Sequence, residues 1–157
     1  MSQEQPAQSK AQVIKAPSDE AVKWPKTVFL AGTTTGPPDW RTGVCDQLSD
    51  LPITIFDPLR PDWTDSWTHD VFRHQVNWEL SKQEEACVVA VYFGANTAAP
   101  ISLMELGLCA KDKKAVVYVE DGYPKKGNVK VVCERYNIHV HDNFENFIQS
   151  IKTKLGV

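Results

Sequence analysis

The chain has 157 residues, a length that suits one domain with a core of its own. Its apolar content of 42% and charged content of 24% are ordinary for a soluble globular protein. A net charge of −3 argues against general affinity for nucleic-acid backbones or anionic membranes, and no apolar run is long enough to span a bilayer. With no hydrophobic signal core at the start, we expect a cytoplasmic protein that binds a small molecule.

Residues 1–22 are rich in Gln, Ser, Ala, Pro and charge. This composition predicts a disordered arm ahead of a single domain over residues 23–157. In that domain, short β-branched and aromatic runs alternate with segments of helical periodicity. The expected strands are 27–31 in KTVFLAG, PITIFDP (52–58), CVVAVYF (87–93), AVVYVE (115–120) and IHV (138–140), and the expected helices are 40–48 capped by Asp39, 67–85, 100–110, 127–137 and 143–155.

The alternation of strands and helices indicates the α/β class. We expect a three-layer α-β-α arrangement with a five-stranded parallel sheet, of flavodoxin-like or Rossmann-like type. In such sheets, ligands bind beyond the carboxyl ends of the strands, where the strand order reverses. The loops 32–40, 57–63 and 94–100 are therefore expected to surround one cleft.

The segment PISLMELGLCA predicts a helix that is apolar on nearly every side, with Glu105 as its only charge. A buried carboxylate is costly unless something compensates for it. One interpretation is structural, because Ser102 to Glu105 matches the S-x-x-E capping box, although Pro100 suits an earlier start of the helix. The other is catalytic, because a poorly hydrated carboxylate near the ligand edge of a sheet is a potent nucleophile or base.

A cofactor is not expected. TTTGPP resembles the phosphate loop of flavodoxins, but that loop works through backbone N–H groups, which Pro37 and Pro38 lack. Flavin binding is therefore kept only as an alternative. A metal site is not expected either, because His69 and His74 are five residues apart, the wrong spacing for one helix face. His139 and His141 would share a strand face, but no cluster of further ligands accompanies them.

Three segments, VFLAG, WELSKQEEACVVAVYF and LMELGLCA, resemble the nucleoside 2-deoxyribosyltransferases, and most closely their deoxyribosyltransferase-like branch. Related folds include nucleotide N-glycosidases. The resemblance covers roughly residues 26–110 and implies that Glu105 is the nucleophile that attacks the anomeric carbon of a (deoxy)ribonucleoside or nucleotide. It also implies that Glu79 contacts the nucleobase and moves a proton on and off it. Because the family's sites usually take groups from a neighbouring subunit, it further implies a homo-oligomer.

The chain departs from the family pattern at two positions. Ala99 stands where the family has an Asp, and Phe29 stands where it often has a Tyr that orients the nucleophile. Nearby polar candidates to replace them are Asn96, Thr97 and Ser102. These departures leave open a second class of function, a non-catalytic nucleotide-binding module or sensor on the same fold.

Other side chains fit a nucleoside cleft. Trp40 and Trp63 can stack on a base, while Arg41 and Arg60 can bind a 5′-phosphate or a base carbonyl. The alternatives are core packing for each Trp, a solvated helix position for Glu79 and, for Arg60, pairing with a neighbouring Asp. The residues predicted to bind substrate are Gly32, Thr33, Trp40, Arg41, Asp57, Arg60, Asp62, Gln75, Trp78, Asn96 and Ser102.

Overall fold

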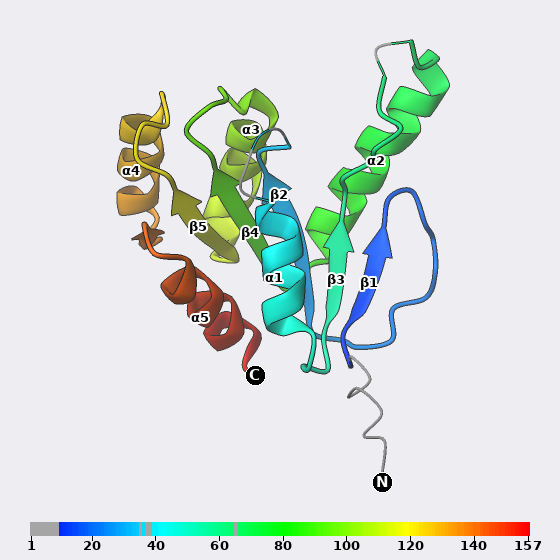
Figure 1. Cartoon of the computed structure of the whole chain (residues 1–157), viewed down its shortest axis with the longest axis horizontal. Coiled ribbons are helices and arrows are strands. Elements are labelled where there is room, and N and C mark those ends of the chain that lie inside the picture. The colour runs from blue at the N-terminus through cyan, green and yellow to red at the C-terminus, as the bar shows by residue number, and fades with distance from the viewer. Residues whose placement is uncertain (1–9, 35, 37–38, 65) are drawn as a thin grey trace, which may run out of the picture.

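The computed structural model describes residues 10–34, 36, 39–64 and 66–157. Within these residues, one parallel sheet of six strands lies between two layers of helices, with the strand order β1-β3-β2-β4-β5-β6 (Figure 1). The α/β class and the layered arrangement are therefore confirmed, and the expected number of strands is one too few. The strands are β1 Gln12–Lys15, β2 Thr27–Gly32, β3 Thr54–Asp57, β4 Val88–Phe93, β5 Ala115–Val119 and β6 Val140–His141.

The additional strand is β1, which lies in the segment expected to be disordered. Its residues pair in parallel with β3, from Gln12 opposite Thr54 to Lys15 opposite Asp57. Ile14 is fully buried, and the side chain of Gln12 bonds to the backbone of Ala21 and Lys23. The expectation of disorder is therefore wrong for this part of the arm, because pairing with a distant strand orders a segment whose own composition is polar. Residues 1–9 lie outside the described residues.

The helices begin and end close to their expected limits. Asp39 caps α1 by accepting a hydrogen bond from the Thr42 amide, Thr68 does the same for α2 through Val71, and Asn143 for α5 through Asn146. The observed helices are α1 Trp40–Leu48, α2 His69–Glu85, α3 Pro100–Cys109, α4 Lys126–Arg135 and α5 Phe144–Leu155, with a short 3₁₀ turn at Ala110–Asp112.

Alternate residues of the strands build two separate cores, one on each face of the sheet. Side chains of α2, α3 and α4 join one core, and side chains of α1 and α5 join the other. Strand β4 is buried on both faces, which explains its continuous apolar pattern. No helix among the described residues is long and apolar enough to cross a membrane.

The strand order reverses between β2 and β4, because the chain passes from β2 to β3 on one side and later returns to β4 on the other. The ends of these two strands are held together: the Thr33 amide donates to the Tyr92 carbonyl at 2.9 Å, and the Gly94 amide donates to Thr33 Oγ1 at 3.2 Å. This is the position where open α/β sheets bind their ligands, and α3 begins just beyond it.

Candidate active site

Glu105 lies on the second turn of α3 and points into the protein. The helix begins at Pro100, its cap residue is Ala99, and no side chain bonds to its first turn. The capping-box interpretation is therefore wrong. Only 7% of Glu105 is exposed, and its Oε2 accepts a hydrogen bond of 2.6 Å from Gln83 Nε2 on α2. The carboxylate is thus tied to a neighbouring helix and not to its own.

Glu79, on α2, is half-buried, so its alternative as a fully solvated helix residue is wrong. Burial raises the pKa of Glu79 to about 7, against a hydrogen bond from Gln75 and the charge of Arg41. Burial, followed by repulsion from Glu79, also raises the pKa of Glu105 to about 7, against the charge of Arg41 and the bond from Gln83. The two carboxyl groups therefore interact electrostatically. Both have pKa values near neutral pH, as proton transfer at neutral pH requires.

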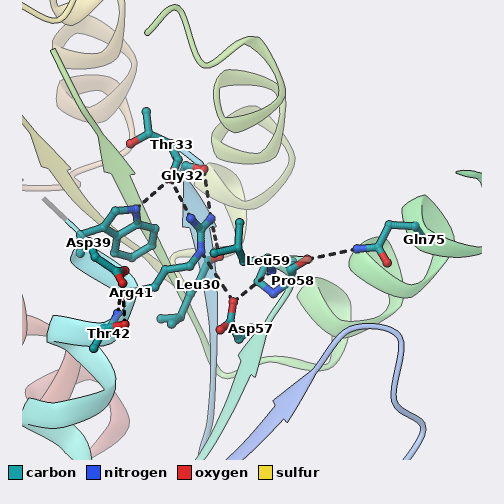
Figure 2. Close-up of polar contacts among 11 residues, drawn as sticks. Leu30, Gly32, Thr33, Asp39, Arg41, Thr42, Asp57, Pro58, Leu59 and Gln75 are labelled. Atoms are coloured by element: carbon teal, nitrogen blue, oxygen red, sulfur yellow. Dashed lines mark hydrogen bonds and ion pairs between the residues drawn. The ribbon is translucent and has the colours of Figure 1, made fainter. Parts of the chain in front are cut away.

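Arg41 is the buried cation of this region. Its Nη1 donates to the Thr33 carbonyl at 2.7 Å, its Nη2 donates to the carbonyls of Gly32 at 3.1 Å and Leu30 at 3.3 Å, and its Nε lies 3.8 Å from Asp57 Oδ1 (Figure 2). Burial lowers the pKa of the guanidinium, and the nearby carboxylates, led by Asp57, oppose this. Because these bonds use most of its donors, Arg41 acts on the two glutamates through its charge, and its expected contact with a phosphate has no support here.

Trp40 packs in the core, which was the alternative to its predicted stacking on a base. Its ring stacks on Tyr92 with centroids 5.1 Å apart, the Arg41 guanidinium lies over it at 4.5 Å, and its Nε1 donates to the Thr33 carbonyl at 2.9 Å. Tyr92 stacks in turn on Tyr118. The indole therefore stabilises the end of β2, and its ring is already in contact with the side chains of Tyr92 and Arg41.

Gly32 and Thr33 shape the reversal point of the sheet. Gly32 has φ of 135°, and a Cβ there would lie 2.4 Å from the Tyr92 carbonyl oxygen, so only glycine allows this approach of β2 to β4. Thr33 is buried and bridges the same two strands through its hydroxyl. Both residues thus lie at the expected ligand edge of the sheet. The function that the structure shows for them there is to hold the ends of β2 and β4 together.

Arg60 pairs with Asp62, as one of its alternatives had it. Its Nε and Nη2 bind the two carboxylate oxygens at 3.0 and 2.7 Å, and its guanidinium lies 4.4 Å above the ring of Trp67. Its Nη1 also reaches Gln75 Oε1 at 3.4 Å, while Gln75 Nε2 donates to the Pro58 carbonyl. This group links the loop after β3 to α2.

The remaining predicted residues divide between the core and the surface. Trp78 is buried and its Nε1 donates to the Ser18 carbonyl, so its ring supports the segment after β1. Asp57 is buried beside Arg41 and accepts a bond from the Leu59 amide. Ser102 is buried on α3, whereas Asn96 is exposed on the loop after β4, and Trp63 is exposed beside Trp67 and Phe72.

Two polar residues of this region were missed. Gln83 holds Glu105, and Glu120, at the end of β5, accepts bonds from the Tyr92 hydroxyl and the Ala95 amide. A signal for Gln83 exists in the sequence, because Gln75, Glu79 and Gln83 follow one another at intervals of four, which places them on one face of a helix. Nothing in the local sequence marks Glu120, whose partners come from another strand.

A family model described as "nucleoside 2-deoxyribosyltransferase like" matches residues 25–123, which is more than half of the chain. The chain belongs to this family. The matched range contains β2 to β5 with both Glu79 and Glu105, and it ends before α4, β6 and α5. No curated protein matches the chain at a significant level. Among the described residues, no group of three or more His, Cys, Asp or Glu side chains that could hold a metal ion is found.

Proposed function

We propose that this protein cleaves or transfers the N-glycosidic bond of a (deoxy)ribonucleoside or nucleotide, with Glu105 as the covalent nucleophile. The observation that carries the proposal is the state of Glu105: a carboxylate with 7% exposure, bonded to Gln83, electrostatically coupled to a second carboxyl group and located beyond the reversal point of the sheet. Membership of the deoxyribosyltransferase-like family supports the same chemistry.

In the first step, an oxygen of ionised Glu105 attacks the anomeric carbon of the sugar. The carbon–nitrogen bond breaks, its electron pair leaves with the nucleobase, and Glu79 gives a proton to that base. The sugar remains attached to Glu105 as an ester. In the second step, a new base or water loses a proton to Glu79 and attacks the same carbon from the side that the first base left, so the configuration is retained overall.

This cycle needs one carboxyl group ionised and the other protonated. With both pKa values near 7 and mutual repulsion between the groups, the pair tends to hold one proton between them near neutral pH. The reactive form is the one in which that proton sits on Glu79. The charge of Arg41 stabilises the ionised member without contacting the substrate.

We further propose a homo-oligomer. The outer side of α3, the helix that carries Glu105, exposes Ile101, Met104 and Leu108 by 58%, 54% and 55%. Their spacing forms one apolar stripe, and such a stripe on a protein surface is typical of an interface. A second copy packed on α3 would cover it and help to exclude water from the sugar ester, which favours transfer over hydrolysis. The cytoplasmic location stays a prediction.

The second candidate function is a nucleotide-binding module without catalysis. The observations that favour it are Phe29 and Ala99, which lack the polar groups that the resemblance leads one to expect. Phe29 is fully buried, and Ala99 caps α3 in a left-handed conformation with φ of 43°. Neither residue supplies a side-chain hydrogen bond to Glu105.

The test is a mechanism-based label. The protein is incubated with 2-fluoro-arabino nucleosides and nucleotides, which slow the second step, and the intact mass is measured. A sugar adduct that maps to Glu105 is expected for the native chain and for the control Glu84→Gln, an exposed acid on α2, but not for Glu105→Gln. Absence of both an adduct and base release across a panel, with measurable nucleotide binding, would favour the non-catalytic module.

A further inference from the structure

Gln83 is the closest polar neighbour that the structure gives to Glu105. It lies near the end of α2, 5% exposed, one turn after Glu79. Its Nε2 donates to Glu105 Oε2 at 2.6 Å, whereas its Oε1 is buried with no hydrogen-bond partner among the residues that the structure describes. A buried amide whose carbonyl oxygen makes no hydrogen bond carries a cost, and such a cost is often tolerated for function.

We propose that Gln83 is a positioning residue for the nucleophile: it holds Oε2 of Glu105 and leaves Oε1 to attack the anomeric carbon. This inference rests on the function proposed above. Gln83 contacts the carboxylate of Glu105 and affects the reaction only by orienting that group. Phe29, on β2, has no polar group with which to orient it.

The orientation of the amide follows from charge. An ionised carboxylate only accepts hydrogen bonds, so it binds the N–H side of an amide and repels the carbonyl side. The bond therefore favours the ionised form of Glu105, in the same direction as the charge of Arg41 and against burial and the repulsion from Glu79. The thiol of Cys109, on the same helix as Glu105, is buried and holds its proton, because burial raises its pKa to about 12.

The backbone that carries Gln83 is itself held in place. Lys114, just before β5, donates from Nζ to the carbonyl of Gln83 at 2.5 Å, with longer contacts to the carbonyls of Glu84 and Ala86 at 3.4 Å. An ammonium group at the carboxyl end of a helix satisfies its last carbonyls and complements its dipole. The end of α2 is thus fixed relative to β5. The backbone from which the Gln83 side chain extends toward α3 is therefore held in place.

The test compares Gln83→Met with Gln47→Met, the same change at an exposed position of α1. Met keeps the approximate volume of Gln and removes the donor. We expect Gln83→Met to lower kcat for base release at least about tenfold, to change KM far less and to move the acidic limb of the pH–rate profile to higher pH. The ¹³C NMR titration of the Glu105 carboxyl group should move in the same direction, and Gln47→Met should change none of these.

A measurement on the native chain keeps the inference testable if Gln83→Met does not fold. The side-chain NH₂ resonances of Gln83 should shift with the ionisation of Glu105, and Glu105→Gln should abolish that shift. The assignment of Gln83 as a positioning residue would be overturned by either of two results. One is that the Gln83 NH₂ resonances do not change as Glu105 ionises, and the other is that Glu105 titrates as in the native chain in folded Gln83→Met. These NMR measurements do not require the protein to be active. A native protein that releases no base would therefore contradict the proposed function but not this inference. A Gln83→Met variant that is active with native kinetics would contradict this inference but not the proposed function.

Discussion

Helices α3 and α5 pack on opposite faces of the same sheet, and they distribute their polar and apolar residues differently. The buried side of α5 is apolar throughout, with Phe147, Ile148, Ile151 and Leu155, and its charged residues are exposed or partly exposed. The buried side of α3 includes Glu105 and Ser102, and its exposed side carries Ile101, Met104 and Leu108. Helix α5 follows the hydrophobic effect throughout, whereas α3 buries Leu106 and Cys109 together with two polar side chains and leaves three large apolar ones exposed.

The difference separates stability from chemistry. Every residue that α5 buries lowers the free energy of the folded state, and its cap at Asn143 and its left-handed Gly156 complete an ordinary amphipathic helix. Helix α3 instead keeps a carboxylate in a poorly hydrated place and leaves its apolar side to solvent or to a partner. Helix α5 therefore supports the sheet, whereas the polarity of α3 fits the proposed site on its buried side and the proposed interface on its exposed side.

The largest expected effect is that of Glu105→Gln. Loss of the nucleophile should lower the rate of base release by at least about a thousandfold. The fold should persist, because the amide removes a buried charge and keeps the shape. Rates measured on protein with a native circular dichroism spectrum will check this, and activity that persists would show that another residue is the nucleophile.

The matching change on α5 is Ile151→Ala, which should act on stability alone. Ile151 is fully buried, so the cavity should lower the free energy of unfolding by about 2–4 kcal/mol. The rate per folded molecule should stay native. Urea denaturation and activity assays on the same samples measure the two quantities. A large loss of rate in folded Ile151→Ala would show that the two faces of the sheet are not independent.

Glu79→Gln should lower the rate of base release by about a hundredfold and remove the basic limb of the pH–rate profile. That limb is expected because Glu79, with a pKa of about 7, must be protonated to serve the leaving base. Steady-state rates between about pH 5 and pH 9 will show it. An unchanged profile would place the proton donor elsewhere.

The stability of the folded protein should fall as the pH rises through neutrality. Glu79 and Glu105 keep their protons up to about pH 7 when folded but release them near their ordinary value of 4.5 when unfolded, so the folded state binds more protons between these values. We expect a loss on the order of 2 kcal/mol between about pH 5 and pH 7. Urea denaturation at several pH values measures it, and Glu105→Gln should show a clearly smaller loss.

The smallest effect on folding is expected from Met104→Glu, on the exposed side of α3. The stability of the subunit should change by less than about 0.5 kcal/mol, because Met104 is 54% exposed on the single chain. The molar mass in solution should fall to that of one chain, whereas Gln149→Glu on the exposed side of α5 should leave it unchanged. Sedimentation equilibrium distinguishes these outcomes, and a native chain that is already monomeric would contradict the interface.

Much of the fold follows from local patterns. All five expected strands exist, Asp39 caps α1 as predicted, and α5 follows the expected range closely, because capping and periodicity depend on residues close in the chain. Strand β1 was missed because its order depends on β3, some forty residues away. The same limit applies to Arg41 and Trp40, whose partners include carbonyl groups of β2 and a ring of β4.

The sequence by itself determined the α/β class, the family and the unusual placement of Glu105 in an apolar helix, because these depend on the order and spacing of residue types. Only the tertiary structure decided which groups surround that carboxylate. Gln83 on α2 bonds to it, and Glu79 on α2 and Arg41 on α1 act on it through their charges, so their effect depends on burial and on distances between helices that are far apart in the chain.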